Sequence, residues 1–246
     1  MRKFRFLHAV YFTALVVLFN ACSGDETKTE KTATDSTKSD SGTVKHDPPL
    51  INSSVAMNVM SVKHKVANYE KWLMAFEAHD SAREANGLHK YVIARGIDDS
   101  NMVLVAMKMD NVEKAKAMAT SKDLKAVMQK AGIVGAPMIS YSEMVMNDTT
   151  AIQSTVRVMV KHKVKDWDAW KKVFDDHKPA RVDAGLTDRV LGHDVADNHN
   201  VTIVFAVSDV DKAKAFMNSD DLKNRMKEGG VEGKPDFFWY RITKKY

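Results

Sequence analysis

Five consecutive residues, Val-Lys-His-Lys-Val, occur at residues 62–66 of this chain and recur 98 residues later. They belong to a longer correspondence. Residues 62–141 align with residues 160–239 at a constant offset of 98 without a gap, and 28 of the 80 pairs are identical. This period is longer than the roughly 20–50 residues of solenoid repeats, so it indicates two copies of one domain. We therefore predict one repeat at 55–148 and a second at 149–246.

The second copy shows the expected elements most clearly. From Thr155 to Val164 apolar and polar residues alternate, which is the period of a strand. Asp166 is a helix N-cap residue, and Gly185 is typical of a helix C-terminus. Between them, four residues spaced four, three and four positions apart share one helix face: Trp170, Phe174, His177 and Arg181.

Three further strands and a second helix complete the copy. Residues 201–207 (VTIVFAV) are apolar on both faces, which predicts a central strand, and the last strand includes residues 237–242. Asp209 is the expected cap of the second helix. Pro179 lies within the first helix, where the other copy has Ser81, and its ring predicts a kink.

The order strand, helix, strand, strand, helix, strand is ferredoxin-like, an α+β arrangement in which both helices cover one sheet face. The other face would be uncovered although its strands carry apolar side chains, so it needs a partner. The neighbouring copy is tethered and therefore present at high effective concentration. We predict that the two repeats form an intramolecular pseudo-dimeric α+β barrel with the helices outside, in a monomeric protein.

Several motifs support a family resemblance. A strand ending in His-Lys-Val, a helix carrying Trp, Phe, His and Arg, and a Gly-Val-x-Gly-x-Pro sequence before the last strand resemble the dimeric α+β barrel superfamily. Within it, the similarity is to antibiotic-biosynthesis-monooxygenase-like and related small domains. The resemblance implies the fold rather than one chemistry, since the superfamily includes cofactor-free oxygenases, haem-degrading enzymes, lactone isomerases and proteins without known activity. The Asn, Trp and His set of the haem-degrading members cannot be placed on matching positions here.

The N-terminus has the layout of an export signal. Three early cations precede an apolar run from Phe6 to Phe19, which is shorter than the roughly 20 residues of a membrane-spanning helix. Cys22, the single cysteine, follows Ala21 and resembles the lipidated residue of a bacterial lipoprotein, with a looser signal of the Bacteroidota type. We predict a signal peptide at 1–21, lipidation of Cys22, and attachment to a membrane of the cell envelope, facing the periplasm or the exterior.

A polar segment follows the predicted anchor. Residues 22–54 are rich in Ser, Thr, Lys and Asp, and such a composition cannot bury enough apolar surface to offset the entropy of ordering. We predict a disordered tether there. The formal charge is +5, and residues 1–21 supply three of those charges, which leaves 5 − 3 = +2. That small balance, without clusters of basic and aromatic residues, gives no indication of nucleic-acid binding.

The sequence contains no phosphate loop, Ser/His/Asp pattern or CxxC pair. We expect no cofactor and no metal, and the candidate ligand-binding residues are histidines and arginines on faces that should be apolar: His64, His79, Arg83, His162, His177 and Arg181. The strand histidines could be rim residues bonded to a neighbour, or ligand contacts in a pocket. The His and Arg side chains on the helices could interact favourably with the helix dipole while their charged groups stay in water. Alternatively, they could bind an anionic group of a ligand.

Two further features have structural interpretations. Methionine is abundant, with 15 in the chain, and suits an adaptable apolar lining or simple gap filling. Lys63 and Lys65, like Lys161 and Lys163, are expected on a solvated strand face, unless the interior of the barrel is polar. The sequence does not say whether His64 and His162 face the helices or the interior.

Three functions remain open. The first is a lipid-anchored binding or accessory module for a small anionic or aromatic molecule, without catalysis. The alternative is a cofactor-free monooxygenase or isomerase that acts on a small aromatic or lactone-like compound, where the substrate itself carries the reactivity. The third is haem binding through one histidine. The residue types favour the first, since no catalytic constellation is present.

Overall fold

The structure is a computed structural model that describes residues 56–246. Its first half contains β1 (Met57–Val66), α1 (Tyr69–Ala78), α2 (Asp80–Ala85), β2 (Leu88–Gly96), β3 (Met102–Met109), α3 (Val112–Thr120), α4 (Lys122–Lys130) and β4 (Ile133–Asn147). Its second half contains β5 (Val156–Val164), α5 (Trp167–Asp176), α6 (Lys178–Asp183), β6 (Leu186–Asp194), β7 (Asn200–Val207), α7 (Val210–Met217), α8 (Asp220–Glu228) and β8 (Val231–Lys245). The predicted signal, Cys22 and the tether lie outside the described residues.

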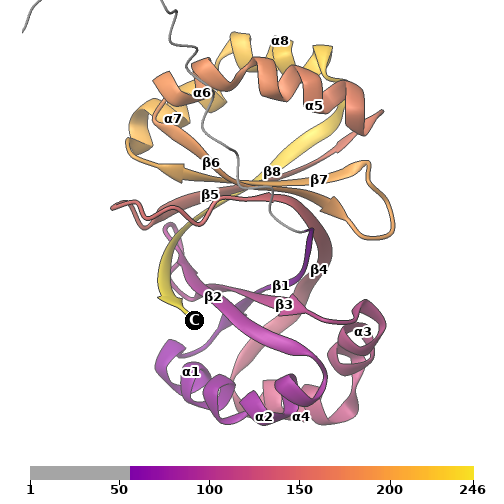
Figure 1. Cartoon of the computed structure of the whole chain (residues 1–246). Coiled ribbons are helices and arrows are strands. Elements are labelled where there is room, and N and C mark those ends of the chain that lie inside the picture. Colours follow the sequence, from indigo (N-terminus) through magenta and orange to yellow (C-terminus); the bar gives the residue numbers. More distant parts are fainter. Residues whose placement is uncertain (1–55) are drawn as a thin grey trace, which may run out of the picture. The chain divides into compact units, whose positions relative to one another are not determined.

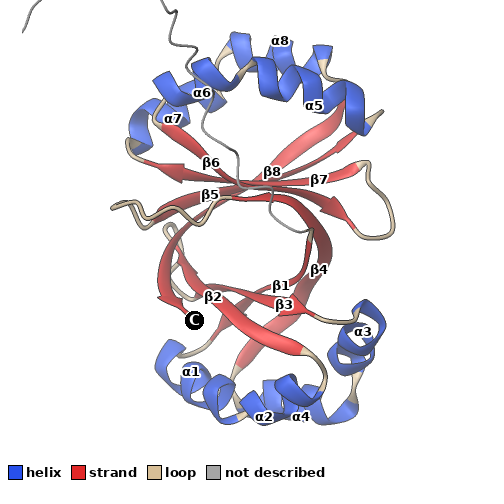
Figure 2. Cartoon of the chain, in the orientation of Figure 1, coloured by secondary structure: helices blue, strands red, loops and turns tan. Residues whose placement is uncertain are grey.

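The eight strands of residues 56–246 form one closed antiparallel barrel, in the order β1-β3-β2-β8-β5-β7-β6-β4. The helices lie outside it, α1–α4 against one side and α5–α8 against the opposite side (Figures 1 and 2). The fold is therefore α+β, as the sequence predicts. Each strand turns one face towards helices or solvent and the other towards the barrel interior. Within the described residues, no helix is both long and apolar enough to cross a membrane.

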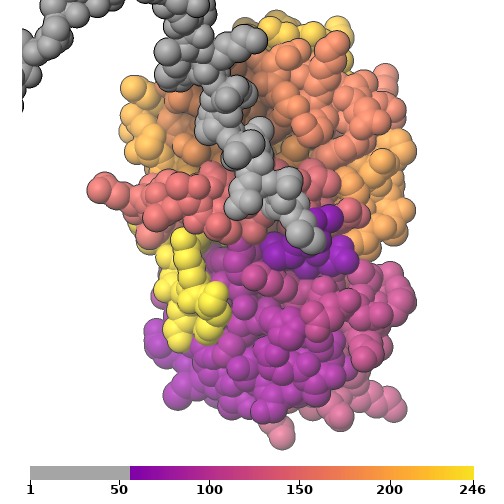
Figure 3. Space-filling model, in the orientation of Figure 1, coloured from indigo at the N-terminus to yellow at the C-terminus, as the bar shows by residue number. Residues whose placement is uncertain are grey.

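Two long strands connect the halves. β4 and β8 have 15 residues each. β4 pairs with β1 and then, over Ser142–Asn147, with β6. β8 pairs with β5 and then, over Tyr240–Lys245, with β2. Figure 3 shows the end of β8, in yellow, lying across the purple first half. The two four-stranded sheets thus share hydrogen-bonded edges, and closure removes the free edges that otherwise promote aggregation.

The caps expected from the sequence are present. Asp166 accepts a hydrogen bond from the backbone N–H of Ala169, and Asp209 accepts bonds at the start of α7. Gly185 follows the helix in the left-handed region, with φ of +75°. There Ser208 Oγ would lie 2.8 Å from an added Cβ, so both backbone and space favour glycine. These signals were sufficient to predict where the helices begin and end, because each depends on interactions within a few residues.

The first helix of each half is interrupted at a histidine. In the second half α5 ends at Asp176 and α6 begins at Lys178, with His177 between them. His79 separates α1 from α2 in the same way, although the first half has no proline at this place. The expected kink exists, but Pro179 is not required for it. Pro179 lies in the first turn of α6, where its missing N–H breaks no helical hydrogen bond.

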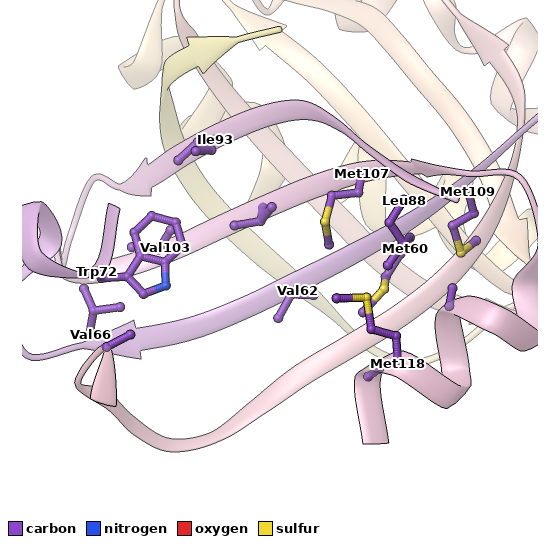
Figure 4. Packing of buried hydrophobic residues seen from close by; sticks show 14 of the residues in the cluster. Met60, Val62, Val66, Trp72, Leu88, Ile93, Val103, Met107, Met109 and Met118 are labelled. Carbon is purple, nitrogen blue, oxygen red and sulfur yellow. The ribbon is translucent and has the colours of Figure 1, made fainter. Parts of the chain in front are cut away.

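Buried apolar side chains form three clusters. One lies between the sheet and α1–α4 and includes Trp72, Leu88 and Met107 (Figure 4). A second lies between the sheet and α5–α8 and includes Trp170. The third lies on the opposite strand faces, inside the barrel: Ala94, Leu104, Met159, Val204 and Tyr240. β7 contributes to the second and third clusters and pairs on both sides, so the predicted central strand at 201–207 is confirmed.

Candidate functional site: a histidine pocket under the helices of each half

The strand histidines face the helices, not the barrel interior. The His162 ring centroid lies 5.3 Å from that of Trp170 on α5, and His64 lies 5.3 Å from Trp72 on α1. Strand alternation explains the placement: positions two apart share a face, and Val160 and Val164 belong to the cluster under α5–α8. The question that the sequence left open is therefore decided in favour of the helix side.

In the second half the three predicted side chains line one cavity. Its volume is about 550 Å³, open mouth included, and His162, His177 and Arg181 all contribute to its wall. The remaining lining is largely apolar and aromatic, and includes Trp170, Phe174, Phe205, Phe216 and Phe237. A concave, largely apolar wall with a few polar groups is the usual form of a small-molecule site.

Arg181 and His177 already have partners. The guanidinium of Arg181 donates from Nε and Nη2 to the carboxylate of Asp188, at 3.0 and 2.8 Å, and it stacks on Phe174. His177 Nε2 lies 2.7 Å from Asp221 Oδ2. The arginine head is buried, contrary to the expectation of a wet head, because Asp188 neutralises it inside the fold. These two residues form the wall of the cavity rather than free anion-binding groups.

His162 differs from them because neither of its ring nitrogens has a hydrogen-bond partner within residues 56–246. The same holds for both nitrogens of His64, which is only 4 % exposed. The expected hydrogen bond from a rim histidine to a neighbour is therefore absent among these residues. Burial lowers the pKa of both histidines to about 4, so both rings are neutral at pH 7. Each then offers one N–H donor and one acceptor nitrogen.

The first half has a related but altered pocket. His64 and Arg83 line a cavity of about 580 Å³ together with Met60, Met107, Met118 and Met128. His79 is not part of that lining, and its Nδ1 is buried without a partner in the described region. Position 90 carries lysine where the second half has Asp188, so Arg83 pairs with Asp80 instead. Of the three predicted residues of the first half, His64 and Arg83 line one cavity, whereas His79 does not.

Sequence reasoning missed the carboxylates that position these side chains. Asp188 and Asp221 were not among the predicted site residues, and Asp188 gives no clear signal because it stands between Thr187 and Arg189 at the start of β6. Lys63 and Lys161 were expected in solvent, but both line a cavity inside the barrel. The reason is the strand alternation: once His64 and His162 face the helices, their neighbours at odd positions face the interior. Within residues 56–246, no group of three or more potential metal ligands comes together.

Known proteins resemble this chain in structure only. No family model and no curated protein matches the sequence. Among solved structures, an anthrone oxidase-like protein superposes with a TM-score of 0.54 at 13 % identity, covering 77 % of this chain and 92 % of that one. A candidate monooxygenase from Fusobacterium nucleatum subsp. nucleatum gives 0.52 at 13 % identity, covering 78 % and 94 %. A mutant chlorite dismutase from Candidatus Nitrospira defluvii, in complex with cyanide, gives 0.52 at 7 % identity, covering 77 % and 91 %.

These similarities concern the fold. They support the resemblance to dimeric α+β barrel proteins that the motifs indicate. At such low identity they assign no residue and no reaction to this chain, because one fold hosts many chemistries.

Proposed function

We propose that this protein is a small-molecule binding protein whose principal ligand site is the cavity lined by His162. The observation that carries the proposal is a neutral imidazole in the wall of an apolar cavity, with two buried nitrogens that the described residues leave unpaired. An unsatisfied buried polar group costs about 1–3 kcal/mol. A ligand with a hydroxyl or carbonyl group beside an aromatic or aliphatic body would recover that cost while it buries its own apolar surface.

The protonation of His162 favours binding over catalysis. A general base works best with a pKa near the working pH, whereas burial lowers the pKa of His162 to about 4. Its two strongest polar neighbours in the wall, Arg181 and His177, are already engaged by Asp188 and Asp221. The arrangement supplies hydrogen-bond recognition at His162 and a largely apolar enclosure.

A cofactor-free oxygenase is the second candidate. It is supported by the fold shared with an anthrone oxidase-like protein and by the aromatic lining of the cavity. In such a reaction the substrate would supply the reactivity, and His162 would accept a proton from a substrate hydroxyl. Consumption of oxygen in the presence of the retained compound distinguishes this function from binding alone.

Haem, the third candidate, does not fit the residues of this cavity. A histidine that binds a metal normally donates its second ring N–H to a carboxylate, a backbone carbonyl or water, which orients the ring. Within residues 56–246, His162 and His64 have no such partner on either nitrogen, and Trp170 and Trp72 pack beside the rings. We therefore derive no step through haem.

Replacing His162 tests the binding function. In His162→Leu we expect the amount of co-purified small molecule to fall at least about tenfold, because the polar anchor is lost. We expect stability to be unchanged or higher, because an unpaired buried ring is replaced by an apolar side chain of similar reach. Untargeted mass spectrometry of compounds released from the full-length protein measures retention, and urea unfolding measures stability.

His199→Leu is the matched control, since His199 is half exposed and pairs with Asp197 on a loop. It should retain the same compounds as the parent protein. The proposal is wrong if folded His162→Leu retains them at the parent level, or if the parent protein itself retains none above an unrelated protein.

We further propose that this binding module is a tandem duplication held at the cell envelope through Cys22. The identical pairs at an offset of 98 and the same element order in both halves support the duplication. The short apolar run that ends at the sole cysteine supports the anchor. Buried acyl chains contribute about 0.8 kcal/mol per CH₂, so several chains hold a protein firmly.

The anchor is tested by Cys22→Ser in the native host. We expect the variant to lose membrane association or to keep its signal uncut, because no thiol remains for acylation. Membrane fractionation and mass measurement of the N-terminus report both outcomes. A variant that is cleaved normally and still fractionates with membranes would refute the anchor.

A further inference from the structure

The barrel interior contains a second cavity, separate from the histidine pockets. It occupies about 1010 Å³, open mouth included, at the end of the barrel opposite to Lys63 and Lys161. Much of its wall is apolar, with Val59, Leu104, Met144, Met159, Val204 and Ile242. The polar part of the wall includes Arg157, Arg189, Thr202 and Tyr240.

Arg157 is a buried cation in this wall, and it is only 3 % exposed. Its Nη1 donates to the backbone carbonyls of Ser154 and Val156, at 2.7 and 2.8 Å. Within residues 56–246, no carboxylate oxygen lies within 4.0 Å of its guanidinium. A buried charge without an opposite charge costs several kcal/mol, so an anion at this position would be strongly favoured.

Arg189 lines the same cavity, but its charge is compensated by a carboxylate. Its Nη1 donates to Asp148 Oδ2 at 3.0 Å, and its Nη2 donates to the backbone carbonyl of Thr150. The arginine pair and Asp148 together leave one positive charge, which is that of Arg157. Burial raises the pKa of the Tyr240 hydroxyl, so this group stays a neutral donor in the same wall.

The fold does not require a cation at this position. Arg157 pairs with Ala206 and Tyr240, and the residue 98 positions earlier, Val59, occupies the same register between Lys108 and Ser142. A valine therefore occupies the equivalent position in the first half, and the barrel closes there without a cation. The guanidinium is an addition specific to the second half, and its cost calls for a compensating interaction.

The other end of the barrel has the same sign of charge. Lys161 Nζ donates to Ser140 Oγ at 2.7 Å, and Lys63 Nζ pairs with Asp236 at 3.2 Å. These residues line a cavity of about 460 Å³ that shares Ser61, Leu104 and Met159 with the wall around Arg157. The interior is thus an apolar middle between two cationic ends, which suits a molecule with an apolar body and an acidic head.

We propose that the barrel interior binds a free organic acid with an apolar body. Its carboxylate contacts the Arg157 guanidinium and the Tyr240 hydroxyl, which are direct cross-strand neighbours on β5 and β8. Its body lies against Leu104, Met159 and Val204. A guanidinium presents its N–H donors in a fixed fork that matches the two oxygens of a carboxylate. This site is separate from the His162 cavity, which lies on the other face of the sheet.

The test uses a matched pair of probes on the full-length protein, 4-phenylbutanoate and its neutral amide, 4-phenylbutanamide, in isothermal titration calorimetry. We expect the parent protein to bind the acid at least about tenfold more tightly than the amide, because hydrogen bonds to charged groups are the stronger ones. Arg157→Gln should abolish that preference, and Arg157→Lys should retain part of it. Inorganic phosphate should not compete, since it lacks the apolar body.

Two control variants distinguish binding inside the barrel from binding elsewhere on the protein. Lys212→Gln removes an exposed cation on α7 and should leave the preference unchanged. His162→Leu should also leave it unchanged, so the two sites can fail independently.

If Arg157→Gln does not fold, Tyr240→Phe removes only a hydroxyl and should weaken binding of the acid while sparing the amide. Equal affinity of acid and amide in the parent protein, no binding of either at millimolar concentration, or a preference that survives in folded Arg157→Gln would each overturn the proposal.

Discussion

Lowering the pH from 7 to 4.5 should destabilise this protein by about 2–3 kcal/mol for each of His64 and His162. Burial lowers the pKa of both rings from 6.5 to about 4. Between those values the unfolded chain binds a proton at each histidine and the folded chain does not. The contribution of the two histidines to the free energy of unfolding is therefore fully present above pH 6.5 and is lost as the pH falls. In this window the slope of the unfolding free energy against pH approaches that of two bound protons. Urea unfolding at pH 7, 6, 5 and 4.5 measures it.

The variants assign the slope to individual rings. His64→Leu and His162→Leu should each reduce the pH dependence of the unfolding free energy by about one proton, and the double variant should no longer lose stability between pH 6.5 and 4.5. His89→Leu is the control, since the hydrogen bonds that this exposed ring donates to Asp110 and Glu84 raise its pKa and give it the opposite dependence. Carboxylates with lowered pKa, such as Glu77 and Asp80, lose their contribution only at lower pH. A parent protein whose stability is constant from pH 6.5 to 4.5 would show that the two rings are not buried and neutral.

Separating the halves should have a larger effect still. A fragment of residues 55–148 retains its helices over one sheet face, but β2 loses its pairing with β8 and β4 loses its pairing with β6. The interior face with Ala94 and Leu104 would then be exposed to water. We expect this fragment to associate into a two-chain barrel or to fold poorly, whereas residues 55–246 should be monomeric.

Light scattering with size-exclusion chromatography gives the mass of each species, and NMR spectra report folding. A matched comparison is the longer chain without residues 241–246, which loses most of the β2–β8 pairing but keeps both halves. It should remain monomeric and be less stable. A monomeric 55–148 fragment with well-dispersed spectra would contradict the dependence of each half on the other.

The sequence determined the local structure well. Strand alternation around Val160, the cap at Asp166 and the positive-φ Gly185 depend on interactions within a few residues, so single positions carry the information. The correspondence at an offset of 98 predicted the same element order in both halves. The α+β class and an arrangement with helices outside the sheet followed from covering the apolar strand faces. The break at His79, without a proline, did not follow, because it depends on packing between helix and sheet.

The site was predicted only as a set of residue types. His162, His177 and Arg181 do line one cavity, but their roles depend on which partners the tertiary structure supplies. Asp188 pairs with Arg181 across a turn, and no residue in the described region forms a hydrogen bond with His162. Arg157 was not suspected, since in sequence it is one polar residue in an alternating strand. Only closure of the barrel buries it, and burial without a counter-charge is a property of the three-dimensional arrangement, because it depends on what every other strand places around the side chain.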